Sequence, residues 1–184
     1  MVKAIIFDYF GVISSDEYWN LVKTDKNVTS DFLNMANRVN LGSLHWKDFM
    51  QMIADRTGQT LEQVKAMYSS ERINPQVVAL AKELHENYMI GMITNAHHEF
   101  LEPIIEKVGL EEVFDAIIIS SKVGYIKPDK RIFDIALKEL GVTAGETIFI
   151  DDIERNIAGA EVAGIKSIHY KSFKQLKQEL EGAL

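Results

Sequence analysis

Short apolar runs that end at polar residues, separated by helical patterns, constrain the fold most strongly. Five such runs occur: KAIIF (3–7), MIGMI (89–93), AIII (116–119), TIFI (147–150) and KSIHY (166–170). Runs of this length are typical of strands, and strands that alternate with helices of about 10–15 residues form parallel sheets. Because most of the runs are apolar throughout, we expect helices on both faces of the sheet. The sequence therefore predicts an α/β fold.

The segments between the later runs carry helix signals. Pro75 is typical of the first position of a helix. Three glycines, Gly109, Gly141 and Gly164, each end a helical pattern, as expected at a C-terminal cap. The predicted helices after the second run span 99–108, 130–140, 156–163 and 173–180.

The alternation is interrupted once, between the first and second runs. Apolar residues recur there at helical spacing around Phe32 and again around Phe49. Thr60 and Gln63 fit a capping box that opens a further helix. No strong strand pattern occurs in this region. We therefore expect a small all-helical subdomain inserted after the first strand.

Composition excludes several classes of function. The net charge of −7 is a poor match for a nucleic-acid backbone, but it does not exclude a small phosphorylated substrate. The absence of cysteine excludes disulfides, thiolate catalysis and thiolate metal sites. No stretch approaches the ~18 apolar residues that span a bilayer, and the first residues lack signal-peptide features. We expect a cytoplasmic protein, a monomer or weak dimer, that binds neither nucleic acid nor membrane.

Polar residues of a few types gather where the strands end. In open α/β sheets, ligands bind at the carboxyl ends of the strands. A single aspartate there is more often a helix cap or a turn residue. Here several residues suited to phosphoryl chemistry share that edge: Asp8, Thr94, Asn95, Lys127, Asp151 and Asp152. Carboxylates so close would repel one another unless a cation or a lysine lay between them. This favours a bound divalent ion, and hard oxygen ligands favour Mg²⁺.

Four segments, FDYFGVI, MITNA, GYIKPD and FIDDIERN, resemble in order and spacing the signature motifs of the haloacid-dehalogenase-like (HAD) hydrolases. The resemblance covers nearly the whole chain. It implies a Rossmann-like core of residues 1–13 and 75–184, and a helical cap of residues 14–74 that covers the site and selects the substrate.

The resemblance also implies a role for each site residue. Asp8 would attack phosphorus and become an aspartyl-phosphate that water hydrolyses. Thr94 and Asn95 would bind the phosphoryl group, and Lys127 would neutralise charge on the reacting oxygens. The implied Mg²⁺ ligands are Asp8, the backbone carbonyl of Phe10, Asp152 and, in support, Asp151.

One position departs from the family pattern. Phosphatases of the family carry an aspartate two residues after the nucleophile, which protonates the leaving oxygen and then activates water; here Phe10 stands there. General acid–base help is worth about 10²–10⁴-fold, so a slow phosphatase is expected. Candidate substitute acids are Asp16 and Glu17, or His97 and His98, although each pair also fits a loop or a helix start. Family members that release halide from 2-haloacids need no such acid and typically carry an aromatic residue there, but they work without metal.

Three hypotheses follow. The first is a Mg²⁺-dependent phosphatase of a small phosphorylated molecule, which the adjacent carboxylates Asp151 and Asp152 favour. The second is a hydrolase of the 2-haloacid dehalogenase type, which Phe10 favours. The third is a weakly catalytic module that binds a phosphorylated ligand.

Overall fold

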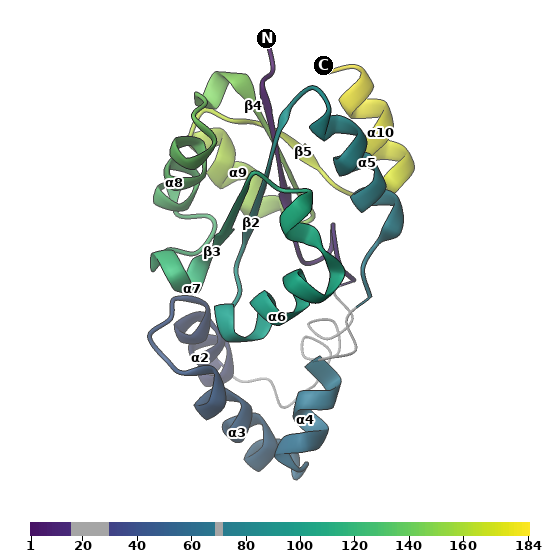
Figure 1. The fold of residues 1–184 in the computed structure, drawn as a ribbon. Helices are drawn as coiled ribbons and strands as arrows, with labels where there is room; N and C mark the ends of the chain where they lie inside the picture. Colours follow the sequence, from purple (N-terminus) through teal and green to yellow (C-terminus); the bar gives the residue numbers. More distant parts are fainter. Residues whose placement is uncertain (16–29, 69–71) are drawn as a thin grey trace.

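The centre of the computed structural model, which describes residues 1–15, 30–68 and 72–184, is a five-stranded parallel sheet (Figure 1). Its strands are β1 (Ala4–Asp8), β2 (Met89–Thr94), β3 (Ala116–Ile119), β4 (Thr147–Asp151) and β5 (Lys166–His169). Their order across the sheet is β3-β2-β1-β4-β5. All five predicted strands are confirmed. β1 is the central strand because it pairs with both β2 and β4.

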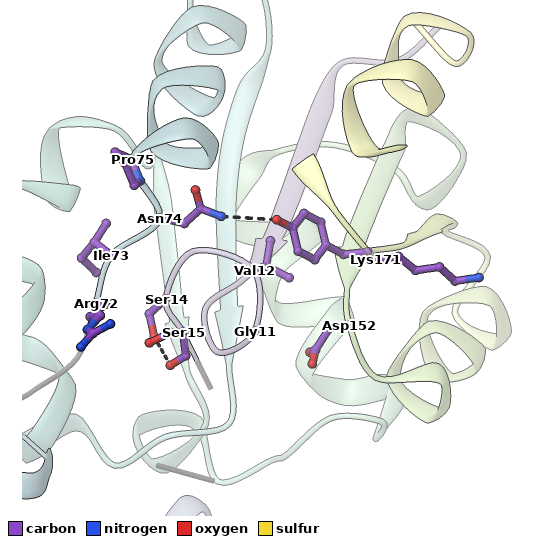
Figure 2. A pocket seen from close by; sticks show the side chains of 11 residues that line it. Gly11, Val12, Ser14, Ser15, Arg72, Ile73, Asn74, Pro75, Asp152 and Lys171 are labelled. Carbon is purple, nitrogen blue, oxygen red and sulfur yellow. Dashed lines mark hydrogen bonds between the residues drawn. The ribbon is translucent and has the colours of Figure 1, made fainter. Parts of the chain in front are cut away.

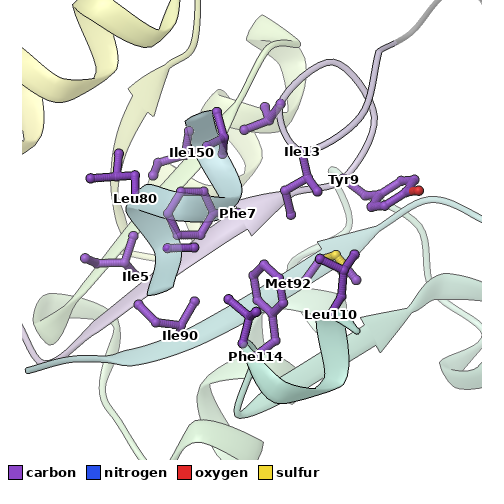
Figure 3. Packing of buried hydrophobic residues seen from close by; sticks show 14 of the residues in the cluster. Ile5, Phe7, Tyr9, Ile13, Leu80, Ile90, Met92, Leu110, Phe114 and Ile150 are labelled. Atoms are coloured by element: carbon purple, nitrogen blue, oxygen red, sulfur yellow. The ribbon is translucent and has the colours of Figure 1, made fainter. Parts of the chain in front are cut away.

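The sheet is covered on both faces, as predicted, and the alternation of side chains along β1 shows how. Ile5 and Phe7 belong to a cluster that includes Leu80 of α5 (Pro75–His85) (Figure 3). The cluster also includes residues of α6 (His98–Val108) and α10 (Phe173–Glu181). Ala4 and Ile6 face the opposite way, toward residues of α8 (Lys130–Leu140) and α9 (Glu154–Val162). The predicted Rossmann-like α/β fold is therefore confirmed.

Local sequence explains several helix ends. Asn74 caps α5 by accepting hydrogen bonds from the N–H groups of Gln76 and Val77, with Pro75 as the first helical residue. Gly109 and Gly141 end α6 and α8 in the left-handed conformation. Shorter pieces are α7 (Ser120–Val123) and two 3₁₀ turns (Leu110–Glu112 and Ala144–Glu146). No helix in the described ranges is long and apolar enough to cross a membrane.

The helices of the inserted region are α2 (Ser30–Asn40), α3 (Trp46–Thr57) and α4 (Leu61–Tyr68). They share a small hydrophobic cluster of their own, which includes Phe32, Phe49 and Val64. Figure 1 shows them beyond the carboxyl ends of the strands, away from both chain termini. The capping box of Thr60 and Gln63 is present, with each side chain accepting from the other residue's N–H. The division into a core (1–13 and 75–184) and a cap (14–74) is compatible with this arrangement and stays a prediction.

The contacts that join the inserted helices to the sheet domain include a hydrogen bond and an aromatic contact. The Ser120 hydroxyl donates to the Asn40 carbonyl at 2.6 Å. Phe100 of α6 packs against both the main cluster and the cluster of the inserted helices. The sequence pattern gave no sign of either contact, because both join segments that are distant along the chain.

Candidate active site

The predicted site residues lie at the carboxyl edge of the sheet. Asp8 ends β1, Thr94 ends β2 and Asp151 ends β4. Because β1 lies between β2 and β4, Asp8 occupies the middle of this edge. Lys127 lies in the loop between α7 and α8.

Lys127 contacts two of the predicted carboxylates at once. Its Nζ lies 2.6 Å from Asp8 Oδ1 and 2.7 Å from Asp151 Oδ2, and it donates to the Ile93 carbonyl at 3.1 Å. All three charged residues are buried, with exposed fractions of 3% for Asp8, 1% for Lys127 and 0% for Asp151. One ammonium group lies between two carboxylates, so these three residues together carry an excess of negative charge when all of them are ionised.

The pKa values reflect that imbalance. Burial raises the pKa of Asp8 well above its usual value; Lys127 opposes this rise and the neighbouring Asp151 adds to it. Burial alone would lower the pKa of Lys127, but the attraction of Asp8 and Asp151 leaves it raised. Lys127 therefore stays charged. Any further positive charge beside Asp8 would stabilise the ionised form of its carboxyl group.

Asp151 is held by groups on both sides. Besides Lys127, it accepts hydrogen bonds from the N–H of Ile153 at 2.8 Å and from the Asn156 amide at 3.1 Å on each oxygen. These bonds fix the carboxylate that positions Lys127. Asn156 was not among the predicted site residues, although it is the last residue of the FIDDIERN motif, which is a signal that could have found it.

The two residues predicted to bind the phosphoryl group differ in their surroundings. The Asn95 side chain accepts from the Lys127 N–H at 2.7 Å and donates to the Lys127 carbonyl at 3.0 Å, so it holds the lysine loop in place. Thr94 is fully buried, and no hydrogen-bond partner for its Oγ1 occurs among the described residues. Such a hydroxyl can donate a hydrogen bond to a ligand oxygen.

Asp152 completes a set of carboxylates suited to a cation. Asp8, Asp151 and Asp152 each offer an oxygen, and these atoms lie within 4.8 Å of one another. A Cβ on Gly11 would lie 2.4 Å from Asp152 Oδ2, so only glycine leaves room for this carboxylate. Hard carboxylate oxygens are the ligands that Mg²⁺ takes in proteins, and a divalent ion would offset the surplus negative charge. The residues present therefore fit the predicted metal.

A pocket of about 670 Å³ adjoins this set (Figure 2). Gly11 and Asp152 line it, together with the segments 14–15 and 72–75 that lead into and out of the inserted region. On its wall, the Asn74 amide donates to the Tyr170 hydroxyl at 3.3 Å. Asp152 is thus the carboxylate of the set that lies at an open surface, while Asp8 and Asp151 lie behind it.

The Phe10 side chain forms part of an aromatic surface. Its ring is partly exposed and stacks on Phe100, with centroids 6.4 Å apart and planes 8° apart. Phe100 contacts Trp46 of α3, with centroids 5.2 Å apart.

The candidate substitute acids have other roles or lie outside the described ranges. His97 is buried, its Nδ1 accepts from the Glu99 N–H at 3.3 Å, and burial lowers its pKa. His98 lies 3.1 Å from the Ser121 hydroxyl. Both histidines thus occupy the start of α6, as the competing interpretation expected. Asp16 and Glu17 lie outside the described residues.

Helix α9 approaches the Lys127 loop closely at Gly159, which yields a test of that packing. A Cβ there would lie 2.5 Å from Pro128 Cβ and 2.7 Å from the Pro128 carbonyl. Alanine favours a helix by about 1 kcal/mol over glycine, but we expect overpacking to dominate, because a clash of this kind costs about 1–3 kcal/mol. Gly159→Ala should therefore lower the free energy of unfolding in urea. Gly145→Ala is the control, because its Cβ would have no atom within 4 Å. A stabilised Gly159→Ala variant would show that the loop yields.

Comparison with known proteins agrees with the sequence motifs. The model of the haloacid dehalogenase-like hydrolases matches residues 2–164. The pyrimidine 5'-nucleotidase YjjG of Escherichia coli (strain K12) is 26% identical over 168 residues, which are 89% of this chain and 75% of that protein. The D-ribitol-5-phosphate phosphatase of Bacteroides thetaiotaomicron is 23% identical over 200 residues, covering 98% of this chain and 97% of that protein.

Solved structures share the fold. A HAD family enzyme of Bacteroides thetaiotaomicron, crystallised as a magnesium complex, superposes with a TM-score of 0.76 at 20% identity and covers 92% of this chain and 93% of its own. The L-2-haloacid dehalogenase of Xanthobacter autotrophicus gives a TM-score of 0.69 at 19% identity, over 100% of this chain and 84% of its own. Fold alone therefore does not exclude a dehalogenase.

Proposed function

Since this chain belongs to the haloacid dehalogenase-like hydrolase family, we propose that it is a Mg²⁺-dependent phosphatase of a small phosphorylated molecule. The observation that carries the proposal is the charge arrangement at the sheet edge. Lys127 bridges Asp8 and Asp151, and Asp152 offers a third carboxylate oxygen within 4.8 Å of theirs. Such an arrangement attracts a divalent cation and the phosphoryl group that accompanies it.

Asp8 is the proposed nucleophile. One of its carboxylate oxygens forms a bond to phosphorus, the leaving oxygen departs, and water hydrolyses the resulting aspartyl-phosphate. The Lys127 ammonium holds Asp8 Oδ1 at 2.6 Å, which orients the carboxylate and neutralises charge that develops on the phosphoryl oxygens. The buried Thr94 hydroxyl is a proposed donor to one of those oxygens. Asn95 acts by holding the Lys127 backbone, and its own backbone is the proposed contact to the phosphoryl group.

The proposed Mg²⁺ ligands are Asp8, Asp152 and the backbone carbonyl of Phe10. Bound there, the ion would neutralise phosphoryl charge and help align the phosphate with Asp8. We assign Asp151 a supporting role, because its two oxygens already serve Lys127, Asn156 and Ile153. Residues 14–74 form the proposed cap that selects the substrate.

A panel of phosphate esters tests the proposal. In the presence of Mg²⁺ we expect release of inorganic phosphate from at least one ester, and a fall of at least about 10⁴-fold in Asp8→Asn, the order seen when a covalent nucleophile is removed. Removal of Mg²⁺ with a chelator should abolish turnover, and adding the ion back should restore it. Turnover no higher in the native protein than in Asp8→Asn, on every ester, would refute the phosphatase proposal.

The same experiment separates the second candidate, a hydrolase of 2-haloacids. Phe10 favours it, because an aromatic residue at that position provides no proton and halide needs none. The three carboxylates favour the phosphatase, because a bound metal would relieve their mutual repulsion and a metal-independent site binds none. Halide release that persists in chelator would establish the dehalogenase.

A further inference from the structure

We propose that the substrate is an aryl phosphate, whose phenolate departs without a proton and whose ring lies against the aromatic surface of Phe10, Phe100 and Trp46. This inference rests on the proposed function and narrows it to a substrate class. Two independent features of the described residues support it: the aromatic surface itself, and the surroundings of the groups that could give a proton.

The aromatic surface starts next to the site residues along the chain. Phe10 comes two residues after Asp8, and it stacks on Phe100 in the helix that follows Thr94 and Asn95. Phe100 in turn contacts Trp46 of the inserted region. All three residues are partly exposed. The surface therefore connects the segment after Asp8, the helix after Thr94 and Asn95, and the inserted region. An aromatic ring of a substrate gains from such neighbours by burial and by stacking.

Three of the described groups near the nucleophile are poorly suited to give a proton to a leaving oxygen. Phe10 is hydrocarbon where an acid would act. Lys127 is shared by two buried carboxylates at 2.6 and 2.7 Å, so its protons are held. His97 packs between Trp46 and His98, with ring centroids 6.1 and 4.6 Å away, and its lowered pKa leaves it neutral.

The leaving group must then be stable as an anion. A phenol has a pKa of about 10, whereas an alkanol is about as weak an acid as water, near 16. An alkoxide therefore needs a proton as its bond breaks, and a phenolate does not. In the first step, an Asp8 oxygen bonds to phosphorus while the phosphorus–oxygen bond to the ring breaks, and the electron pair leaves on the phenolate, which takes a proton from solvent after release.

The second step is the slow one. Water attacks the phosphorus of the aspartyl-phosphate, the electron pair of the broken bond returns to the Asp8 carboxylate, and the proton of water passes to solvent. Because Phe10 cannot act as a general base for that water, the aspartyl-phosphate accumulates. Aryl substrates should therefore give a rapid burst of one phenolate per site, followed by slow turnover.

Phenyl phosphate and cyclohexyl phosphate form a matched pair, because their six-membered rings are similar in size and only the acidity of the leaving group differs greatly. With Mg²⁺ present, we expect kcat/KM to be at least about 10²-fold higher for phenyl phosphate, the lower end of what a general acid supplies. With 4-nitrophenyl phosphate, rapid mixing should show a burst near one equivalent. Rates within tenfold for the two rings, without a burst, would overturn the inference and indicate an acid such as Asp16 or Glu17.

Variants test the aromatic surface separately. Phe100→Leu should raise KM for phenyl phosphate about 3–10-fold, the range expected for one aromatic contact, with less than a twofold change in inhibition by inorganic phosphate. Phe173→Leu makes the same change in a partly buried phenylalanine of α10 and should leave that KM unchanged. Equal effects of the two variants would overturn the placement of the ring. Absence of hydrolysis above Asp8→Asn for aryl and alkyl phosphates alike would instead refute the phosphatase proposal itself.

Discussion

Replacing Lys127 with methionine should lower the free energy of unfolding by about 3–5 kcal/mol, the usual result of removing one partner from a buried ion pair. The reason is the position of its ammonium group between Asp8 and Asp151, which are both buried. Without it, two carboxylates face each other in a site of low dielectric. Denaturation in urea at neutral pH, without divalent ions, measures the loss.

The loss of stability in Lys127→Met should also depend on pH and on Mg²⁺. A carboxyl group whose folded pKa exceeds its unfolded value binds more protons in the folded state, so its contribution to stability falls as pH rises. The deficit of Lys127→Met should therefore be smaller in acid than at neutral pH, and Mg²⁺ should reduce it. Lys122→Met is the control, because Lys122 pairs with Glu102 at the surface and such pairs are worth about 0–1 kcal/mol. Similar losses in both variants would show that Lys127 has no special electrostatic role.

The second large effect is expected from Gly11→Ala. The added Cβ would lie 2.4 Å from Asp152 Oδ2 and 2.5 Å from its Cγ, so the carboxylate must move. If Asp152 binds the metal as proposed, kcat/KM should fall by about 10²-fold, as it does when a group at a reacting centre is displaced by about 1 Å. The Mg²⁺ concentration required for half-maximal activity should rise as well.

A matched control removes the effect of backbone strain. Gly11 has a φ of +81° and Gly58 a φ of +69°, so alanine in this left-handed region costs about 1–2 kcal/mol at either position. A Cβ on Gly58, however, would meet no atom within 4 Å. Gly58→Ala should therefore lose stability and keep its Mg²⁺ dependence. If Gly11→Ala also kept the native Mg²⁺ dependence, the proposed role of Asp152 would be wrong.

The fold was predictable because its signals are local. Each strand is an apolar run, and Gly109 and Gly141 end helices where the pattern predicted. The structure differs at boundaries: α9 begins at Glu154 rather than at 156, and α6 begins at His98 rather than at 99. The hydrogen bond from the Ile153 N–H to the Asp151 side chain allows the chain to turn into α9 directly after the strand. Apolar periodicity does not register a bond of this kind.

The candidate site was predictable only as a set of residues. Parallel strands bring their carboxyl ends together, so the strand ends brought Asp8, Thr94 and Asp151 to one edge. The sequence could not show which of them contact each other. The double hydrogen bond between Asn95 and the Lys127 backbone spans 32 residues, and Asn156 holds Asp151 from another element. Contacts of this kind depend on the tertiary structure and leave no periodic pattern.

The central place of β1 has a consequence for the protein during its synthesis. β1 leaves the ribosome before its neighbours β2 and β4, which begin only at Met89 and Thr147. Asp8 is therefore synthesised well before Lys127 and Asp151 can contact it. A nascent chain that ends before residue 147 has β1 as an unpaired edge on one side and lacks Asp151 and Asp152. Chains released early should accordingly depend on chaperones, and none of them should hydrolyse phosphate esters.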